Sequence, residues 1–352
     1  MKNWTFTLLL AFLSALGWSQ DIPVPKVQNS LVTKMTATWC SICGSTAWDN
    51  YKSLVGSLNS KALVMAGHVS PSSALYSPTA ERLIQNFETA LSHPTFFYNN
   101  TRMGSSGTTM VNNISTNVNN ANRNAPQAQA GLVATLDPGT RALTIKSKAE
   151  FFQSVQGEYY LGFYLLEKTI KTAQAARSSD ETHQNVLRAA LQSDLFGELL
   201  ASGNVAQGTT KSIQVNLNLS PNFNPNNLLI AAIIWKKNGA KFDFVNLNFT
   251  GEVSATVTSA QNLQLLQGFH ILPNIVSDNA LVRIELPEAS ANAAVEVFDV
   301  FGRRIHTIYQ GRLAAGKHEF HLDKAALNAA PGYYVLRLRS GREQAVRQFL
   351  VQ

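Results

Sequence analysis

The chain has 352 residues, 45% of them hydrophobic and 14% charged, so it can bury more than one core and is expected to form two or three domains. Its formal charge is +7, but the basic residues are scattered among acidic ones, without a basic stripe interleaved with aromatics, which argues against nucleic-acid binding. The low charged fraction, with abundant Asn, Ser, Thr and Ala, favours an extracellular β-rich protein.

The first residues have the pattern of an export signal. Lys2 supplies the positive start, residues 6–16 form a short apolar run, and Gly17 and Ser19 are the small residues that precede a cleavage site. We therefore predict a signal peptide over residues 1–19 and export through the inner membrane. The apolar run is too short for a transmembrane segment, and we predict none elsewhere in the chain.

Strand and helix patterns alternate in the next hundred residues. Strands are predicted at 31–38, 62–69 and 96–98, and helices at 47–58, 79–91 and 108–122. This order favours a layered α/β domain with right-handed crossovers, which we place at residues 25–126.

From Gly131 onward the hydrophobic period changes to that of strands bounded by Gly, Pro and Asn. The predicted strands are 131–136, 142–151, 159–167, 210–219, 228–236 and 242–249. We expect a middle β-sandwich over residues 131–258. Its least strand-like part, residues 180–200, is expected to be a long loop with a helical turn.

A last change of pattern occurs near Gly268. Alternating strands are predicted at 281–286, 294–298, 304–309, 316–322, 333–338 and 344–351. Their spacing of about 10 to 12 residues predicts a separate antiparallel module over residues 270–352, with the fold of an immunoglobulin-like β-sandwich. The fold class is thus multidomain, α/β followed by all-β.

The chain's two cysteines, Cys40 and Cys43, lie at the predicted junction between a strand and a helix. A disulfide across two residues closes almost no loop, so redox chemistry or metal binding is considered before stability. A helix start would lower the pKa of the Cys40 thiol, and Cys43, one turn on, could attack a mixed disulfide at Cys40. Trp39 before the pair and Pro94 before a later strand strengthen this interpretation.

In this combination the chain resembles the thioredoxin superfamily. Carried over by position, the resemblance implies that Cys40 is the nucleophile, Cys43 the resolving thiol and Pro94 a cis-proline. The chain departs from the family's pattern between the cysteines, where Ser41 and Ile42 replace the usual Gly-Pro. It also shows no clear β-hairpin after the proline.

Zinc is the alternative for the same cysteines. A site would need Cys40, Cys43, His68 and His93 to come together. Redox chemistry already explains the spacing of the two cysteines without metal, so we interpret the two histidines as ordinary residues at strand ends. We predict no metal and no cofactor.

Two wider resemblances follow. The stretch 31–249 resembles the Omp28-related outer membrane protein family, which joins a thioredoxin-like domain to a β-sandwich. The residues that carry this resemblance are Thr38, Trp39, Cys40, Cys43, Gly44, His68, His93, Pro94, Thr95, His183, Asn185, Val186, Leu187 and Arg188.

The C-terminal segment resembles the type A sorting domain of type IX secretion, through Val295, Val297, Phe298, Asp299, Gly302, Arg303 and the stretches 313–318 and 332–338. This resemblance implies the type IX secretion machinery as a partner, and its alternative is an adhesive immunoglobulin-like module.

Two functions stay open at this stage. The first is thiol–disulfide exchange with a protein partner in the cell envelope or at the surface, and the second is surface binding or adhesion with the thioredoxin-like domain as a scaffold. Both place the protein at the outer membrane, on the cell surface or in the medium. The site residues predicted for exchange are Cys40, Cys43, Pro94 and Trp39.

Overall fold

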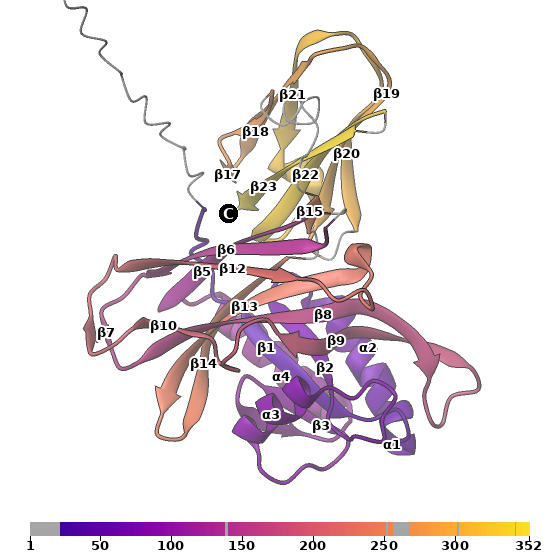
Figure 1. Cartoon of the computed structure of the whole chain (residues 1–352), viewed down its shortest axis with the longest axis vertical. Coiled ribbons are helices and arrows are strands. Elements are labelled where there is room, and N and C mark those ends of the chain that lie inside the picture. Colours follow the sequence, from indigo (N-terminus) through magenta and orange to yellow (C-terminus); the bar gives the residue numbers. More distant parts are fainter. Residues whose placement is uncertain (1–21, 138–139, 251–252, 256–267, 301–302, 342) are drawn as a thin grey trace, which may run out of the picture.

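The computed structural model describes residues 22–352 apart from 138–139, 251–252, 256–267, 301–302 and 342. The predicted signal peptide at 1–19 and Gly302 of the predicted sorting motif lie outside the described residues. The described part is mostly β-strand in several sheets, with few helices. Figure 1 shows the N-terminal helices and the first strands at one end, the long middle strands across the centre and the C-terminal strands at the other end.

The N-terminal part is a small sheet covered by helices on both faces. Its elements are β1 (Ser30–Thr36), α1 (Ser41–Gly44), α2 (Thr46–Leu58), β2 (Ala62–His68), α3 (Pro78–Phe87), β3 (Thr95–Tyr98), β4 (Thr101–Gly104) and α4 (Thr108–Asn122). Strand β1 pairs in parallel with β2 and antiparallel with β3. One core packs α2 and α4 on one face of these strands, and another packs α3 on the opposite face.

Strands β3 and β4 form an antiparallel hairpin directly after Pro94. The sequence did not reveal this hairpin because each of its strands has only four residues. A period-2 pattern cannot be recognised over so short a run.

The middle part contains the longest strands. Its elements are β5 (Ala128–Leu136), β6 (Ala142–Phe151), β7 (Val155–Gln156), β8 (Tyr159–Ala173), β9 (Asp180–Ala190), β10 (Glu198–Ala201), β11 (Asn204–Val205), β12 (Thr210–Asn218), β13 (Leu228–Asn238), β14 (Lys241–Thr250) and β15 (Ser254–Ala255). A second, four-stranded sheet has the order β12-β6-β5-β15. It covers one face of β8 and β13.

The prediction of a loop with a helical turn over residues 180–200 is wrong, because this stretch contains β9 and β10. The first residues of β9 are polar and pair only with β8, and the buried residues of β9 come later, so no regular alternation marks the strand. Its residue Val186 pairs with Ala66 of β2 in parallel.

This single pairing joins the N-terminal and middle strands into one nine-stranded sheet. The strands follow the order β14-β13-β8-β9-β2-β1-β3-β4, with β10 paired to β8. In β8, Tyr164 and Leu166 face the core beneath α3, whereas Phe163 and Leu165 face the four-stranded sheet. Strands buried on both faces read as continuous apolar runs, which explains the sequence of β8 and β13.

The C-terminal part has two sheets around its own core. Its elements are β16 (Phe269–Leu272), β17 (Ile275–Val276), β18 (Asn279–Leu286), β19 (Ser290–Asp299), β20 (Arg304–Leu313), β21 (Gly316–Asp323), α6 (Lys324–Leu327), β22 (Gly332–Ser340) and β23 (Glu343–Val351). The sheets have the orders β16-β18-β21 and β17-β23-β22-β19-β20. Alternate residues such as Val295, Val297, Leu336 and Leu338 fill the space between them.

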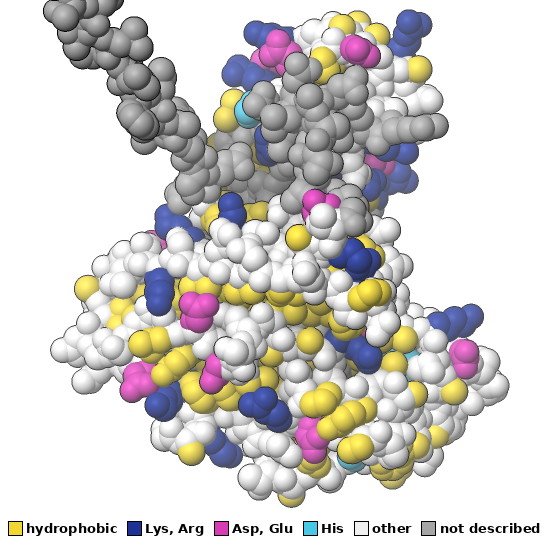
Figure 2. Space-filling view, in the orientation of Figure 1, with side chains coloured by type: hydrophobic (Ala, Val, Ile, Leu, Met, Phe, Trp, Pro, Cys, Tyr) yellow, Lys and Arg dark blue, Asp and Glu magenta, His cyan; other side chains and the backbone are white. Residues whose placement is uncertain are grey.

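Charged side chains are spread over the surface. On the face shown in Figure 2, Lys and Arg side chains lie interspersed with acidic ones over the sheets and the C-terminal part. Among the described residues, no helix is long and apolar enough to cross a membrane.

Candidate functional site

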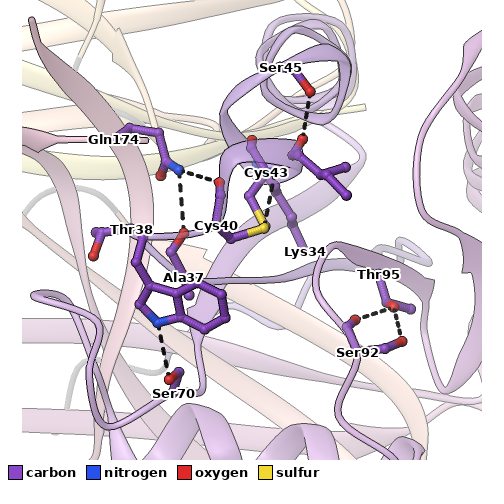
Figure 3. The surroundings of a disulfide bond; sticks show 12 residues. Lys34, Ala37, Thr38, Cys40, Cys43, Ser45, Ser70, Ser92, Thr95 and Gln174 are labelled. Carbon is purple, nitrogen blue, oxygen red and sulfur yellow. Dashed lines mark hydrogen bonds between the residues drawn. A yellow bond between two sulfur atoms is a disulfide. The ribbon is translucent and has the colours of Figure 1, made fainter. Parts of the chain in front are cut away.

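The cysteine pair lies where β1 turns into α1. Cys40 is the N-cap residue of α1 and has extended backbone angles, so its side chain is positioned at the start of the helix. The two cysteines form a disulfide with a Cα–Cα distance of 5.2 Å, and the backbone N–H of Cys43 donates to the Cys40 sulfur at 3.1 Å. Figure 3 shows this pair between Lys34 and Gln174. Helix α1 ends at Gly44, and a break at Ser45 separates it from α2.

Both cysteines are buried, Cys43 more completely than Cys40. Cys40 is 6% exposed, and Cys43 is fully buried at 0%. Trp39, directly before the pair, is 51% exposed. Its Nε1–H donates to the Ser70 hydroxyl at 3.2 Å, and its ring lies 5.5 Å from that of His93. Ile42, between the cysteines, is 61% exposed, so exposed apolar residues flank Cys40 closely along the chain on both sides.

Pro94 reaches the same end of the sheet through β3. The His93–Pro94 peptide bond is cis. Because Thr95 pairs with Met35 of β1, the proline lies beside the end of the strand that leads to Cys40. The predicted residues Trp39, Cys40, Cys43 and Pro94 are therefore carried on two neighbouring strands and the loops that follow or precede them.

The tip of the β8–β9 hairpin contacts the cysteine turn from a distant part of the sequence. The Gln174 side-chain amide donates to the carbonyl oxygens of Cys40 at 3.0 Å and Ala37 at 3.3 Å, as Figure 3 shows. The N–H of Ala175 donates to the carbonyl of Thr38 at 2.8 Å. A Cβ added at Gly44 would lie 1.9 Å from the Ala175 carbonyl oxygen, so the close approach requires glycine there.

Behind the disulfide lies a buried cation that the sequence analysis did not single out. Lys34 of β1 is 1% exposed, and its ammonium donates to the Cys43 carbonyl at 3.0 Å. It lies 5.4 Å from the centre of the Trp48 ring and 5.5 Å from that of Tyr51, both on α2. Burial, reinforced by the charge of Arg177, lowers the pKa of Lys34 to about 7. The sequence signal that could have indicated this site is a lysine in the middle of a strand that is otherwise free of charge.

Two buried histidines adjoin Lys34. His68 ends β2, and its Nδ1 lies 3.0 Å from the Ser73 hydroxyl. The His68 ring is 5.4 Å from that of His183 on β9, which in turn meets Trp48 edge-on at 4.9 Å. Burial holds the pKa of His68 well below its usual value and that of His183 at about 4. The sequence could not find His183 here because residues 180–200 were predicted to be a loop.

The residues of the zinc alternative have other partners in this structure. Both cysteine sulfurs are in the disulfide, His68 contacts Ser73, and His93 packs against Trp39. Within the described ranges, no group of three or more His, Cys, Asp or Glu residues is arranged to hold a metal ion.

These features together define a class of site. A Cys-x-x-Cys disulfide at a helix start, directly after a strand and beside a cis-proline, fits a thioredoxin-like site.

The C-terminal part matches the model of the FlgD Ig-like domain over residues 274–343. This match agrees with its β-sandwich architecture.

The chain is similar to proteins of solved structure. The chain is similar to HBP35 of Porphyromonas gingivalis, with 16% identity, a TM-score of 0.55, and coverage of 93% of this chain and 99% of the other. It also matches a domain of the outer membrane lipoprotein Omp28 from Porphyromonas gingivalis, with 14% identity and a TM-score of 0.27, over 38% of this chain and 92% of that domain. The first likeness concerns the fold of nearly the whole chain. No curated protein matches the chain.

Proposed function

We propose that this protein is an exported thiol–disulfide exchange protein of the bacterial cell envelope or surface, related to the Omp28-type outer membrane proteins. The observation that carries the proposal is the Cys40–Cys43 disulfide at the start of α1, with Cys40 the outer sulfur and the cis-proline Pro94 beside it. Its proposed domains are the thioredoxin-like segment 25–126, the β-sandwich segment 131–258 and the sorting module 270–352.

The two cysteines have unequal roles in the proposed reaction. In the reduced protein the N–H of Cys43 is placed to donate to the Cys40 sulfur, which favours the Cys40 thiolate over the thiol. That thiolate attacks a disulfide of the partner protein, forming a mixed disulfide and releasing one partner thiolate. Cys43 then attacks the Cys40 sulfur, and the second partner thiolate leaves. Trp39 and Ile42 offer an apolar contact for the partner next to the reacting sulfur.

Single substitutions test these roles. We expect Cys43→Ser to accumulate mixed disulfides through Cys40, because nothing resolves them, whereas Cys40→Ser abolishes exchange, because the buried Cys43 cannot reach an external disulfide. The measurement is mass spectrometry of the variants after incubation with a disulfide-bonded peptide. Equal trapping by both variants, or no trapping by either, would contradict the proposal and favour the scaffold interpretation.

We also propose that the C-terminal module directs type IX secretion. The support is the sorting motif around Val295–Asp299 and the immunoglobulin-like sandwich that residues 274–343 match. We expect a chain that lacks residues 268–352 to stay in the periplasm, whereas the complete chain reaches the surface. Fractionation with immunoblotting measures this, and surface display of the shortened chain would overturn it.

A further inference from the structure

The buried position of Cys43 raises a question about its proton. Exchange requires the Cys43 thiol to become a thiolate before it attacks the mixed disulfide at Cys40. The side chain is 0% exposed and packs with Ala37 and Cys40, so bulk water has no direct access to it. A buried apolar setting also disfavours the thiolate. The proton therefore needs an acceptor inside the protein.

Lys34 is placed to be that acceptor. Its ammonium is hydrogen-bonded to the Cys43 carbonyl, and no carboxylate among the described residues forms an ion pair with it. The carboxylate of Asp49 is bound by Arg177 at 2.8 Å instead. Because the pKa of Lys34 is lowered to about 7, its amine can be neutral at physiological pH and accept a proton.

A small cavity adjoins Lys34, and neither cysteine lines it. Four of the side chains that line it have a buried polar atom without a hydrogen-bond partner within the described part of the chain: Thr36 Oγ1, Trp48 Nε1, His68 Nε2 and His183 Nε2. Orphan polar groups around a small cavity are what a buried water needs as partners. Lys52, 48% exposed, and Thr182 line the cavity as well and connect it to the surface.

We propose that Lys34 exchanges the proton of the Cys43 thiol during disulfide exchange, and that the cavity bounded by His68 and His183 carries this proton between Lys34 and solvent. The inference rests on the proposed function. In the resolving step the proton moves from the Cys43 thiol to the neutral Lys34 amine, and the Cys43 thiolate forms a bond to the Cys40 sulfur. The bond from Cys40 to the partner sulfur breaks, and its electron pair leaves with the partner thiolate. The protein dithiol is oxidised, the partner disulfide is reduced, and a cellular dithiol reductant restores the starting state.

Several charged or titratable residues surround Lys34, so the pH dependence of proton transfer at Lys34 is set by all of them together. They are Cys43 on α1, Asp49, Tyr51 and Lys52 on α2, His68 on β2, Arg177 at the hairpin tip, and Glu181 and His183 on β9. Both histidines lose their charge well below neutral pH, and Asp49 and Glu181 are paired with Arg177 and Lys52. Lys34, by contrast, has its pKa lowered to about 7 by burial and by the charge of Arg177.

The test follows the reduced full-length protein as it reacts with one equivalent of an aromatic disulfide that releases a coloured thiolate. The first release reports attack by Cys40, and the second reports resolution by Cys43. We expect Lys34→Met to slow the second release at pH 7 by about tenfold or more, with the first release changed by less than about threefold. The pH profile of the second release should move above the free-thiol value of about 8.5, because the buried setting disfavours the Cys43 thiolate. An unchanged second phase would overturn the inference.

Three controls separate the explanations. Lys146→Met removes an exposed cation of β6 that does not line the cavity, and it should leave the second phase unchanged. Lys34→Arg keeps the charge but cannot give up its proton, so it should remain slow, whereas full rescue would show a purely electrostatic role and contradict the inference. If neither Lys34 variant folds, the pH profile of the second release in the wild-type protein is the test. An inflection of this rate near pH 7 would support Lys34 as the proton acceptor, and an inflection above pH 8 would contradict it. Absence of any second release from the wild type would refute the proposed function itself.

Discussion

At the scale of single residues, the buried titratable groups behind the disulfide link the site to pH. His183 is almost fully buried and uncharged at neutral pH, because burial keeps its pKa at about 4, below its usual value of 6.5. Between these two values the unfolded chain binds a proton that the folded chain does not. The free energy of unfolding therefore falls as the pH is lowered from about 6.5 to about 4, by at most about 1.4 kcal/mol per pH unit for this histidine.

We predict that His183→Gln makes this pH dependence shallower by about 1 kcal/mol per pH unit, whatever it does to stability at pH 7. Urea denaturation at a series of pH values from 4 to 7 measures the slope. His270→Gln, at an exposed histidine of β16, is the matched control and should leave the slope unchanged. Equal slopes for wild type and His183→Gln would show that this histidine is not held neutral by the fold.

At the scale of elements, the β8–β9 hairpin acts as a support for the cysteine turn. Gln174 satisfies two carbonyls of that turn, and Arg177 binds Asp49 of α2. The hairpin belongs to the middle strands, so the geometry of the Cys-x-x-Cys pair depends on residues about 130 positions further along the chain. Gly44 is where the two backbones come closest.

We predict that Gly44→Ala destabilises the protein by about 1–3 kcal/mol, because the new methyl group would overlap the Ala175 carbonyl and force the hairpin tip away. Displacing the tip should also increase the alkylation rate of reduced Cys40. Gly56→Ala is the control in the neighbouring helix α2, where a Cβ has nothing within 4 Å. It should stabilise by about 0.5–1 kcal/mol through helix propensity. Urea denaturation and timed alkylation measure both effects, and equal results for the two substitutions would rule out the proposed support.

At the scale of the whole molecule, the nine-stranded sheet makes the N-terminal and middle segments depend on one another. The core beneath α3 combines residues of β1 and β2, such as Leu31 and Leu63, with Leu229 and Trp235 of β13. The C-terminal part has a separate core made of its own strands. The predicted boundary between residues 126 and 131 thus lies between two segments that share a sheet and a core.

We predict that residues 25–126 expressed alone do not unfold cooperatively, because removing the later strands exposes half of that core. Residues 22–250, which keep the complete sheet, should unfold in a single transition. Circular dichroism during thermal unfolding, with heteronuclear NMR spectra of both fragments, measures this. A native-like, cooperatively folded 25–126 fragment would show that the shared core is dispensable.

The sequence by itself determined the features that depend on neighbours along the chain. The cysteine pair between a strand and an amphipathic helix, the helices α2, α3 and α4, and most strands follow from hydrophobic period and turn residues within short windows. The order of exposure of Cys40 and Cys43 follows in the same way, since helix geometry places the first at the N-cap and the second one turn inside.

Only the tertiary structure decided what surrounds that pair. Gln174 contacts Cys40 across 134 residues of sequence, and the strand that carries His183 pairs with β2 through Val186 and Ala66. A local sequence pattern carries no information about such distant partners. Strand β9 was missed because half of it is polar and paired on one side alone. Lys34 can be read from the sequence, but its burial and its hydrogen bond to the Cys43 carbonyl arise only when α1 and α2 pack against β1. The chemistry proposed for Lys34 therefore depends on packing, which removes water from the lysine and from the thiol together.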